Sequence, residues 1–238
     1  MKKSKPTKSN DPVKILRMIS RDEELERNDG KWVAMNRAYK NHKKYDRKRD
    51  KKVDLDPFSL IIHPADPSTQ FLQALYPEWQ DLVLGEKDSN AVVKQALRDT
   101  PRPMLLGHGT EYGLLCPQGS KQFGRIIVGS DHVYLLREKE YVIGIWCNAS
   151  QFALKYGLHG LFSQMVVSEL EEAMMCSIMT SQEEITEMNQ AWAEDLGDLI
   201  RNYPLCDVPR LMEERERWGT ELTRYNWTAL EWFEKEKD

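Results

Sequence analysis

The chain has 238 residues, of which 30% are charged and 40% are hydrophobic, a balance typical of a globular protein with one good core and a small appendage. No apolar run approaches the roughly 20 residues of a membrane-spanning helix, and no hydrophobic segment follows the basic N-terminus, so neither a membrane protein nor a secretory signal is predicted. The four cysteines have neither a CxxC pair nor the spacing of metal ligands. We therefore expect a cytoplasmic protein with reduced thiols, no metal and no cofactor.

The net charge of −4 conceals two regions of opposite charge. Residues 1–53 contain 18 Lys and Arg against 8 Asp and Glu, a net charge of +10. The rest of the chain contains the other 16 basic and 30 acidic residues, a net charge of −14. This distribution indicates a basic N-terminal arm, residues 1–56, joined to an acidic body.

The arm allows two interpretations. Residues 1–12 are rich in Lys, Ser and Pro and are expected to be disordered. Farther along, Lys and Arg are interleaved with Trp32, Tyr39 and Tyr45, a combination found in nucleic-acid-binding segments. A solvated helix, or an arm that docks on the acidic body of its own or another chain, explains the same charges. The partner of the arm is therefore a nucleic acid or an acidic surface.

Residues 57–180 have the alternating pattern of an α/β body. Phe58–His63 is an apolar run typical of a strand, and Met104–Gly107 is another. Between them, Ser68 or Thr69 opens one predicted helix, and Ser89 opens a second that Pro101 ends. Strands that alternate with helices over short connections predict a mostly parallel sheet flanked by helices.

The same pattern continues to the C-terminus. We expect a loop or hairpin at Leu114–Gly124, a strand at Val142–Trp146, a helix from Ser150 that Gly157 ends, and a strand from Gly160. Residues 181–238 form a predicted C-terminal helical extension. It contains a long amphipathic helix from Ser181 to about Asn202 and one more helix over Leu211–Lys237.

Two of the predicted strands end on potentially reactive side chains. Pro103-Met-Leu-Leu-Gly leads to His108, and Tyr141-Val-Ile-Gly-Ile-Trp leads to Cys147. If these strands are parallel neighbours, the imidazole and the thiol emerge side by side at the carboxyl edge of the sheet. A cysteine beside a histidine is the minimum requirement for thiolate catalysis, and a helix starting just after Cys147 would lower its pKa. The alternatives are a hydrogen-bonded turn histidine and a buried cysteine that acts as a small hydrophobe.

The segment Gly-His108-Gly-Thr-Glu-Tyr-Gly-Leu, followed by an apolar strand that ends in Cys147-Asn-Ala-Ser, resembles the caspase-like (clan CD) cysteine peptidases, most of all the bacterial CHAT and gingipain-type domains. The resemblance extends from Phe58 to Met175. It implies a caspase-like sheet and an endopeptidase for peptide or protein substrates. Cys147 would be the nucleophile and His108 the proton shuttle to the leaving amine. It also implies an oxyanion hole made by the N–H groups of Gly109 and Cys147.

Three further residues are candidates for substrate binding. His63 ends the first strand at the same edge of the sheet, and Asp66 and Asp131 lie in polar segments that could border the pocket. Acidic residues there would favour a basic substrate side chain. Two other functions fit the same sequence: a catalytically inactive interaction scaffold, and a nucleic-acid-associated accessory protein that acts through its basic arm.

Overall fold

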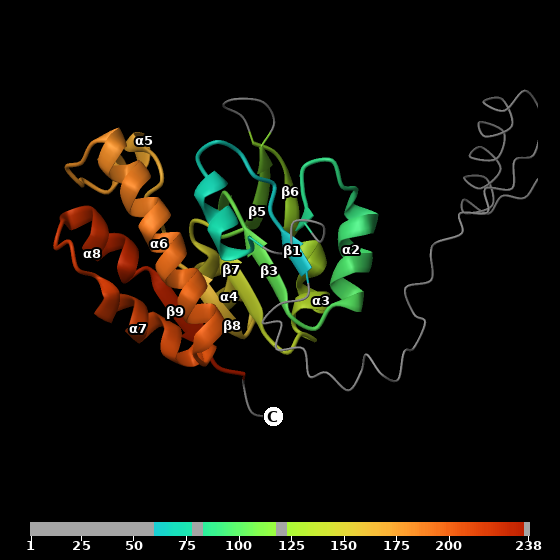
Figure 1. Ribbon diagram of the computed structural model, residues 1–238. Coiled ribbons are helices and arrows are strands. Elements are labelled where there is room, and N and C mark those ends of the chain that lie inside the picture. Colours follow the sequence, from blue (N-terminus) through green and yellow to red (C-terminus); the bar gives the residue numbers. More distant parts are fainter. Residues whose placement is uncertain (1–59, 78–82, 118–122, 236–238) are drawn as a thin grey trace, which may run out of the picture. The chain divides into compact units, whose positions relative to one another are not determined.

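The computed structural model describes residues 60–77, 83–117 and 123–235, all within one compact unit, Leu55–Asp238 (Figure 1). The predicted basic arm lies outside the described residues. The described part confirms the α/β fold class, because a mostly parallel six-stranded sheet has helices on both faces. No helix in these three ranges is long and apolar enough to span a membrane.

The main sheet has the strand order β2-β1-β3-β7-β8-β9. All neighbouring strands are parallel except β8 and β9, which are antiparallel. The strands are β1 (Leu60–Ile62), β2 (Val83–Leu84), β3 (Pro103–Leu106), β7 (Val142–Ile145), β8 (Gly160–Ser163) and β9 (Leu230–Phe233). A smaller antiparallel sheet contains β4 (Gly109–Thr110), β5 (Gly113–Pro117) and β6 (Phe123–Gly129). The region predicted as a loop or hairpin is therefore a hairpin, β5-β6.

Alternate residues of the main strands point to opposite faces of the sheet, as the period of two requires. Ile61, Leu106 and Ile145 belong to one hydrophobic core, and Leu105 and Phe162 belong to the other. The first core includes η1 (Gln70–Leu75), α5 (Leu170–Met175), α6 (Gln182–Asn202), α7 (Val208–Arg215) and α8 (Glu221–Trp227). The second core includes α2 (Asn90–Asp99), α3 (Val133–Leu136), α4 (Ala149–Tyr156) and the hairpin (Figure 1).

Local capping signals place several helix ends where the sequence predicts them. The Ser89 side chain accepts a hydrogen bond from the Val92 N–H and caps α2, and Ser181 accepts one from Glu184 and caps α6. At the end of α4, Gly157 takes the left-handed conformation with a φ of 59°.

The C-terminal segment differs from the predicted single helix. In the described part of Leu211–Lys237, α7 ends at Arg215, α8 follows, and β9 then pairs with β8. The segment predicted as a helical extension thus supplies the last strand of the main sheet. The two-residue strand β2 was likewise not predicted. Strands of two to four residues are too short to produce a clear alternation of polar and apolar side chains.

A buried asparagine fixes the connection between β8 and α5. The Asn226 side chain accepts a hydrogen bond from the Val167 N–H (2.9 Å) and donates one to the Val167 carbonyl (3.1 Å). The Asn226 carbonyl accepts a third from the Trp192 indole N–H (2.9 Å). Helices α6 and α8 therefore determine the path of the chain that enters α5.

Candidate active site

Strands β3 and β7 are parallel neighbours, so the condition stated for the imidazole and the thiol to emerge side by side is met, and the register of these strands aligns His108 with Cys147. Leu106 pairs with Ile145, and His108 and Cys147 each follow two residues later. Both residues therefore occupy equivalent positions beyond the carboxyl ends of adjacent strands, the edge at which sites of parallel α/β sheets form.

His108 and Cys147 line one small cavity of about 20 Å³, which has room for roughly one water molecule. Its other walls come from η1, the ends of β3 and β7, and the chain after β8: Thr69, Phe71, Leu72, Gly107, Ile145, Trp146, Ser163, Val166 and Ser168. A much larger cavity of about 1190 Å³ shares Phe71, His108 and Ser168 with the small one. The larger cavity therefore adjoins the two reactive residues.

The imidazole of His108 is held by the turn that precedes η1. Its Nε2 atom lies 3.1 Å from Asp66 Oδ2 and 2.7 Å from Ser68 Oγ, and the Ser68 hydroxyl donates a hydrogen bond to Asp66 Oδ1 (2.9 Å). A carboxylate can only accept hydrogen bonds, so we infer that Nε2 bears the proton in this contact.

Asp66 remains ionised in this arrangement. Burial alone would raise its pKa, but His108 and the hydrogen bonds from Ser68 and Thr69 outweigh burial and lower the pKa below its ordinary value. Asp66 also lines the larger cavity. Asp66, which was predicted to border the substrate pocket, thus lines the larger cavity and also orients His108.

The thiol of Cys147 is not activated in this conformation. Its single S–H proton has two acceptors within reach of Sγ, Glu172 Oε1 (3.7 Å) and the Val166 carbonyl oxygen (4.0 Å). Burial, followed by the charge of Glu172, raises the pKa of Cys147 to about 12. The expectation that α4 lowers this pKa is wrong, because the loss of hydration and the carboxylate outweigh the helix that begins at Ala149.

Gly109 follows His108 in β4. A Cβ atom at this position would lie 1.9 Å from Cδ1 of Trp146, so only glycine fits. The same indole donates a hydrogen bond from Nε1 to the Thr110 carbonyl (3.1 Å). Trp146, which directly precedes Cys147 and was predicted only as the last residue of a strand, thus connects the chain at Cys147 to the segment that follows His108.

His63 and Asp131 line neither of the two cavities. His63 is buried, and its Nδ1 atom lies 2.6 Å from the hydroxyl of Tyr76, the residue that follows η1. Asp131 is exposed in η3 (Ser130–His132), beyond the end of β6. Neither predicted substrate-binding residue therefore lines a cavity, although the charges of Asp66 and His108 both act on His63.

The stability of the protein should fall as the pH decreases from 7 to 5, because burial lowers the pKa of His63 from 6.5 to about 4. At a pH between the two pKa values, His63 is protonated in the unfolded chain but not in the folded protein, so acid favours unfolding. The expected loss from His63 is about 2 kcal/mol in the free energy of unfolding. Urea denaturation at both pH values measures it.

The control for this prediction is His63→Gln, which does not titrate. Burial also lowers the pKa of His132, so His132 contributes to the pH dependence in the same direction in both proteins. The difference between wild type and variant isolates His63. Equal pH dependence in the two proteins would contradict the prediction.

The four cysteines are free thiols, and the described residues contain no group of three or more His, Cys, Asp or Glu side chains placed to hold a metal ion. No protein-family model matches this chain, and no curated protein sequence shows significant similarity to it. The function must therefore be inferred from the geometry of the site.

Proposed function

We propose that this protein is a cysteine endopeptidase of the caspase-like kind, with Cys147 as the nucleophile and His108 as the proton carrier. The observation that supports it most strongly is the equivalent placement of these residues after parallel neighbouring strands, where both face one cavity. The Asp66 carboxylate, which orients the imidazole, adds the third element that such a pair needs.

In the proposed reaction the sulfur of Cys147 attacks the carbonyl carbon of a peptide bond while its proton moves to His108. His108 passes that proton to the leaving amine, the C–N bond breaks, and the acyl group remains on sulfur as a thioester. Water then adds its hydroxyl group to the acyl carbon and gives its proton to His108; the C–S bond breaks, the acyl group leaves as a carboxylic acid, and His108 returns the proton to the sulfur. By resemblance, the N–H groups of Gly109 and Cys147 would stabilise the oxyanion.

The larger cavity is suited to a peptide. Its volume of about 1190 Å³ exceeds the roughly 300–1,000 Å³ of pockets for small molecules. Its walls are mainly polar side chains from the turn before η1 and from the chain around α5 and α6. A peptide bound there would approach His108 from the side that Asp66 also faces.

An interaction scaffold with the same fold and no turnover is the second candidate. Two observations favour it: the raised pKa of the Cys147 thiol, and the 20 Å³ cavity, which is too small for a peptide bond. Peptidase activity would therefore require that a bound substrate displace the side chains around the Cys147 sulfur.

Reaction with peptidyl acyloxymethyl ketones separates the two candidates. We expect intact-mass analysis to show one adduct, which peptide mapping places on Cys147. The adduct should be absent in Cys147→Ala and greatly reduced in His108→Ala. Cys206→Ser is the matched control, because Cys206 is an exposed thiol in η4 (Leu205–Asp207), and it should react like the wild type. No adduct, or an adduct on Cys206 alone, would favour the scaffold.

A further inference from the structure

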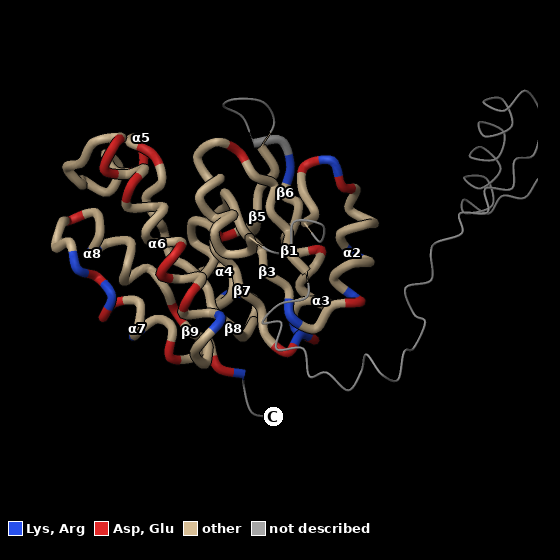
Figure 2. The backbone as a smooth tube through the Cα atoms, in the orientation of Figure 1, with Lys and Arg blue, Asp and Glu red and all other residues tan. Residues whose placement is uncertain are grey.

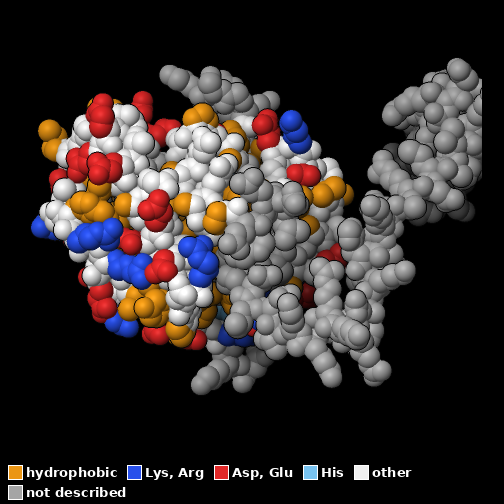
Figure 3. Space-filling view, in the orientation of Figure 1, with side chains coloured by type: hydrophobic (Ala, Val, Ile, Leu, Met, Phe, Trp, Pro, Cys, Tyr) orange, Lys and Arg blue, Asp and Glu red, His pale blue; other side chains and the backbone are white. Residues whose placement is uncertain are grey.

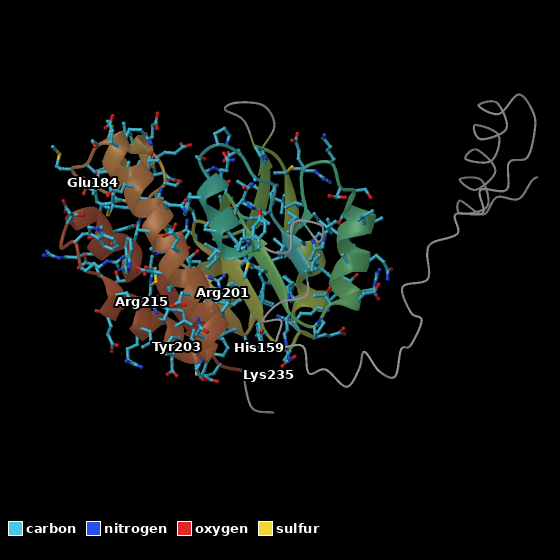
Figure 4. The ribbon with its side chains drawn as sticks, viewed as in Figure 1. His159, Glu184, Arg201, Tyr203, Arg215 and Lys235 are labelled. Carbon is cyan, nitrogen blue, oxygen red and sulfur yellow. The ribbon has the colours of Figure 1, made fainter. Side chains whose placement is uncertain are left out.

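A buried asparagine on α6 belongs to the wall of the larger cavity. Asn189 is only 3% exposed, but it lines this cavity together with Phe71 and His108. In Figure 4, Glu184 marks the end of α6 near α5 and Arg201 lies near the opposite end; in the sequence, Asn189 comes between them, nearer to Glu184. A peptide that fills the larger cavity would therefore touch a buried carboxamide as well as the imidazole.

The orientation of the Asn189 carboxamide is set by Asn226. The Asn226 side chain exchanges two hydrogen bonds with the main chain of Val167, which identifies its oxygen and its nitrogen. The same nitrogen of Asn226 also donates to Asn189 over 3.4 Å, and only an oxygen can accept this bond. Asn189 therefore presents Oδ1 to Asn226, and its Nδ2 atom lies on the other side of the group.

The Nδ2 atom of Asn189 has two N–H groups and makes no hydrogen bond to any described residue. In the described part of the chain, the fully enclosed side-chain nitrogen and oxygen atoms without a partner are Nε2 of His63 and Nε2 of His132. Asn189 Nδ2 is not one of them, so it keeps contact with the space that Asn189 lines, which is the larger cavity. A ligand that brings an acceptor into this cavity would satisfy the donor.

The charge of the cavity excludes an anion as this acceptor. Asp66, Glu169, Glu171 and Glu187 line the cavity, and no Lys or Arg is among the described residues that line it. Figure 2 shows acidic residues concentrated along α5 and α6, and Figure 3 shows them on the surface over α5. These carboxylates would repel a ligand carboxylate or phosphate. An uncharged oxygen remains, and in a peptide the commonest one is the carbonyl oxygen of an amide.

The donor is held in place before a ligand binds. Hydrogen bonds run from Asn189 through Asn226 to Val167, and the carbonyl of the preceding Val166 is one of the two acceptors near the Cys147 thiol. The wall of the larger cavity and the chain beside the sulfur are therefore connected by one buried side chain. A donor that is already fixed lowers the cost of ordering that binding must overcome.

We propose that Asn189 Nδ2 donates a hydrogen bond to a main-chain carbonyl of the substrate and thereby holds the peptide in the larger cavity. This inference rests on the proposed peptidase function and adds a substrate-binding residue to it. Asn189 lines only the larger cavity, whereas Cys147 lines only the small one, so the contact lies away from the bond to be cleaved. Every residue of a peptide has a main-chain carbonyl, so the contact fixes the path of the substrate without selecting a side chain.

Nuclear magnetic resonance of the Asn189 side-chain N–H groups tests the contact directly. The probe is acetyl-alanine N-methylamide, which has two main-chain amides and no charge. We expect its titration into isotope-labelled wild-type protein to shift the Asn189 side-chain signals until they saturate. No saturable shift would overturn the proposal. Tighter binding of propionamide, which imitates a Gln or Asn side chain, would overturn the assignment to the main chain, and equally tight binding of acetate would contradict the exclusion of anions.

Asn189→Asp removes the donor and keeps an oxygen for Asn226, because at neutral pH both aspartate oxygens only accept. It is compared with the wild type by using peptidyl acyloxymethyl ketones of one to six residues. For the long probes, we expect at least a tenfold rise in KI, the concentration that gives half of the maximal rate of Cys147 alkylation, with the maximal rate unchanged. The one-residue probe should keep both constants within about threefold. A purely structural role of Asn189 would affect all probe lengths alike, and an unchanged KI for the long probes would overturn the proposal.

Gln190→Glu is the matched control. Gln190 is the next residue of α6 and lines the same cavity, but its Nε2 atom already donates to Glu194 Oε1 (2.8 Å). The substitution adds the same charge to the cavity as Asn189→Asp. The KI of the long probes should stay within about threefold of the wild type. A rise as large as in Asn189→Asp would show that the added charge, and not the lost donor, weakens binding.

The two measurements keep this inference separate from the peptidase proposal, because acetyl-alanine N-methylamide forms no covalent adduct. Saturable shifts at Asn189 without an adduct on Cys147 from any ketone would exclude the peptidase and retain the binding site. Adducts on Cys147 with the same KI in wild type and Asn189→Asp would retain the peptidase and exclude the role of Asn189. If Asn189→Asp does not fold, the titration of the wild-type protein still decides.

Discussion

Cys147→Ala and His108→Ala should each lower peptide turnover at least about a thousandfold. The first variant lacks the nucleophile, and the second lacks the group that takes the thiol proton and gives it to the leaving amine. Because the two side chains act as one unit, the double variant should be scarcely slower than Cys147→Ala. The measurement is kcat/KM on a panel of fluorogenic peptides that vary the residue before the cleaved bond.

The control variants replace thiols outside the site. Cys206→Ser and Cys116→Ser should leave the rate nearly unchanged, although Cys116 is buried in β5 and its replacement costs some stability. Independent, multiplicative losses in the double variant would mean that His108 and Cys147 do not share one reaction, and full activity in Cys147→Ala would exclude the proposed nucleophile.

Gly160→Ala should destabilise the native state by about 3–5 kcal/mol, a large part of the stability of a typical domain. An added Cβ would lie 1.9 Å from the carbonyl oxygen of Val142 and 2.7 Å from its nitrogen, and the φ of Gly160 is 136°. Both obstacles are backbone atoms of β7, the strand that pairs with β8 and precedes Cys147. No side-chain rotation can relieve the contact, so β7 and β8 would have to separate. Urea denaturation measures the loss.

Gly157→Ala is the control for the conformational part of this cost. Gly157 also has a positive φ, of 59°, but no atom lies within 4 Å of an added Cβ. Its replacement should cost only about 1–2 kcal/mol, the penalty of a left-handed alanine. Equal losses in the two variants would show that close packing of β7 on β8 contributes nothing.

Local signals made much of the fold predictable. Ser89 and Ser181 satisfy the first N–H groups of the helices they cap, and these hydrogen bonds span only three residues. Apolar runs bounded by Gly and Pro identified β3 and β7 as strands, while their adjacency was a condition that the sequence could not settle. The sequence thus placed His108 and Cys147 just after two strands, and the observed pairing of those strands gives the two residues equivalent positions.

The parts that escaped prediction depend on contacts between distant residues. Glu172 is 25 residues from Cys147, and three glutamates lie near the start of α5, so no pattern indicates which one turns to the sulfur. The chain that leads into α5, and with it the position of Glu172, is held by the hydrogen bonds of Asn226, which lies 59 residues beyond Val167. The same contacts raise the pKa of Cys147. The local argument from α4, the helix that follows Cys147, considered none of them and therefore predicted a lowered pKa.

The position of β9 at the sheet edge has a consequence for the growing polypeptide on the ribosome. Until β9 has been synthesised, one side of β8 presents unpaired backbone groups that other chains could pair with. Asn226, which holds the entry to α5, is made at nearly the same time. The nascent chain would therefore complete its sheet and fix Glu172 beside the thiol in one event, after the other strands have been made. A translation product cut short before Asn226 would have neither the protected edge nor the fixed carboxylate that restrains the sulfur.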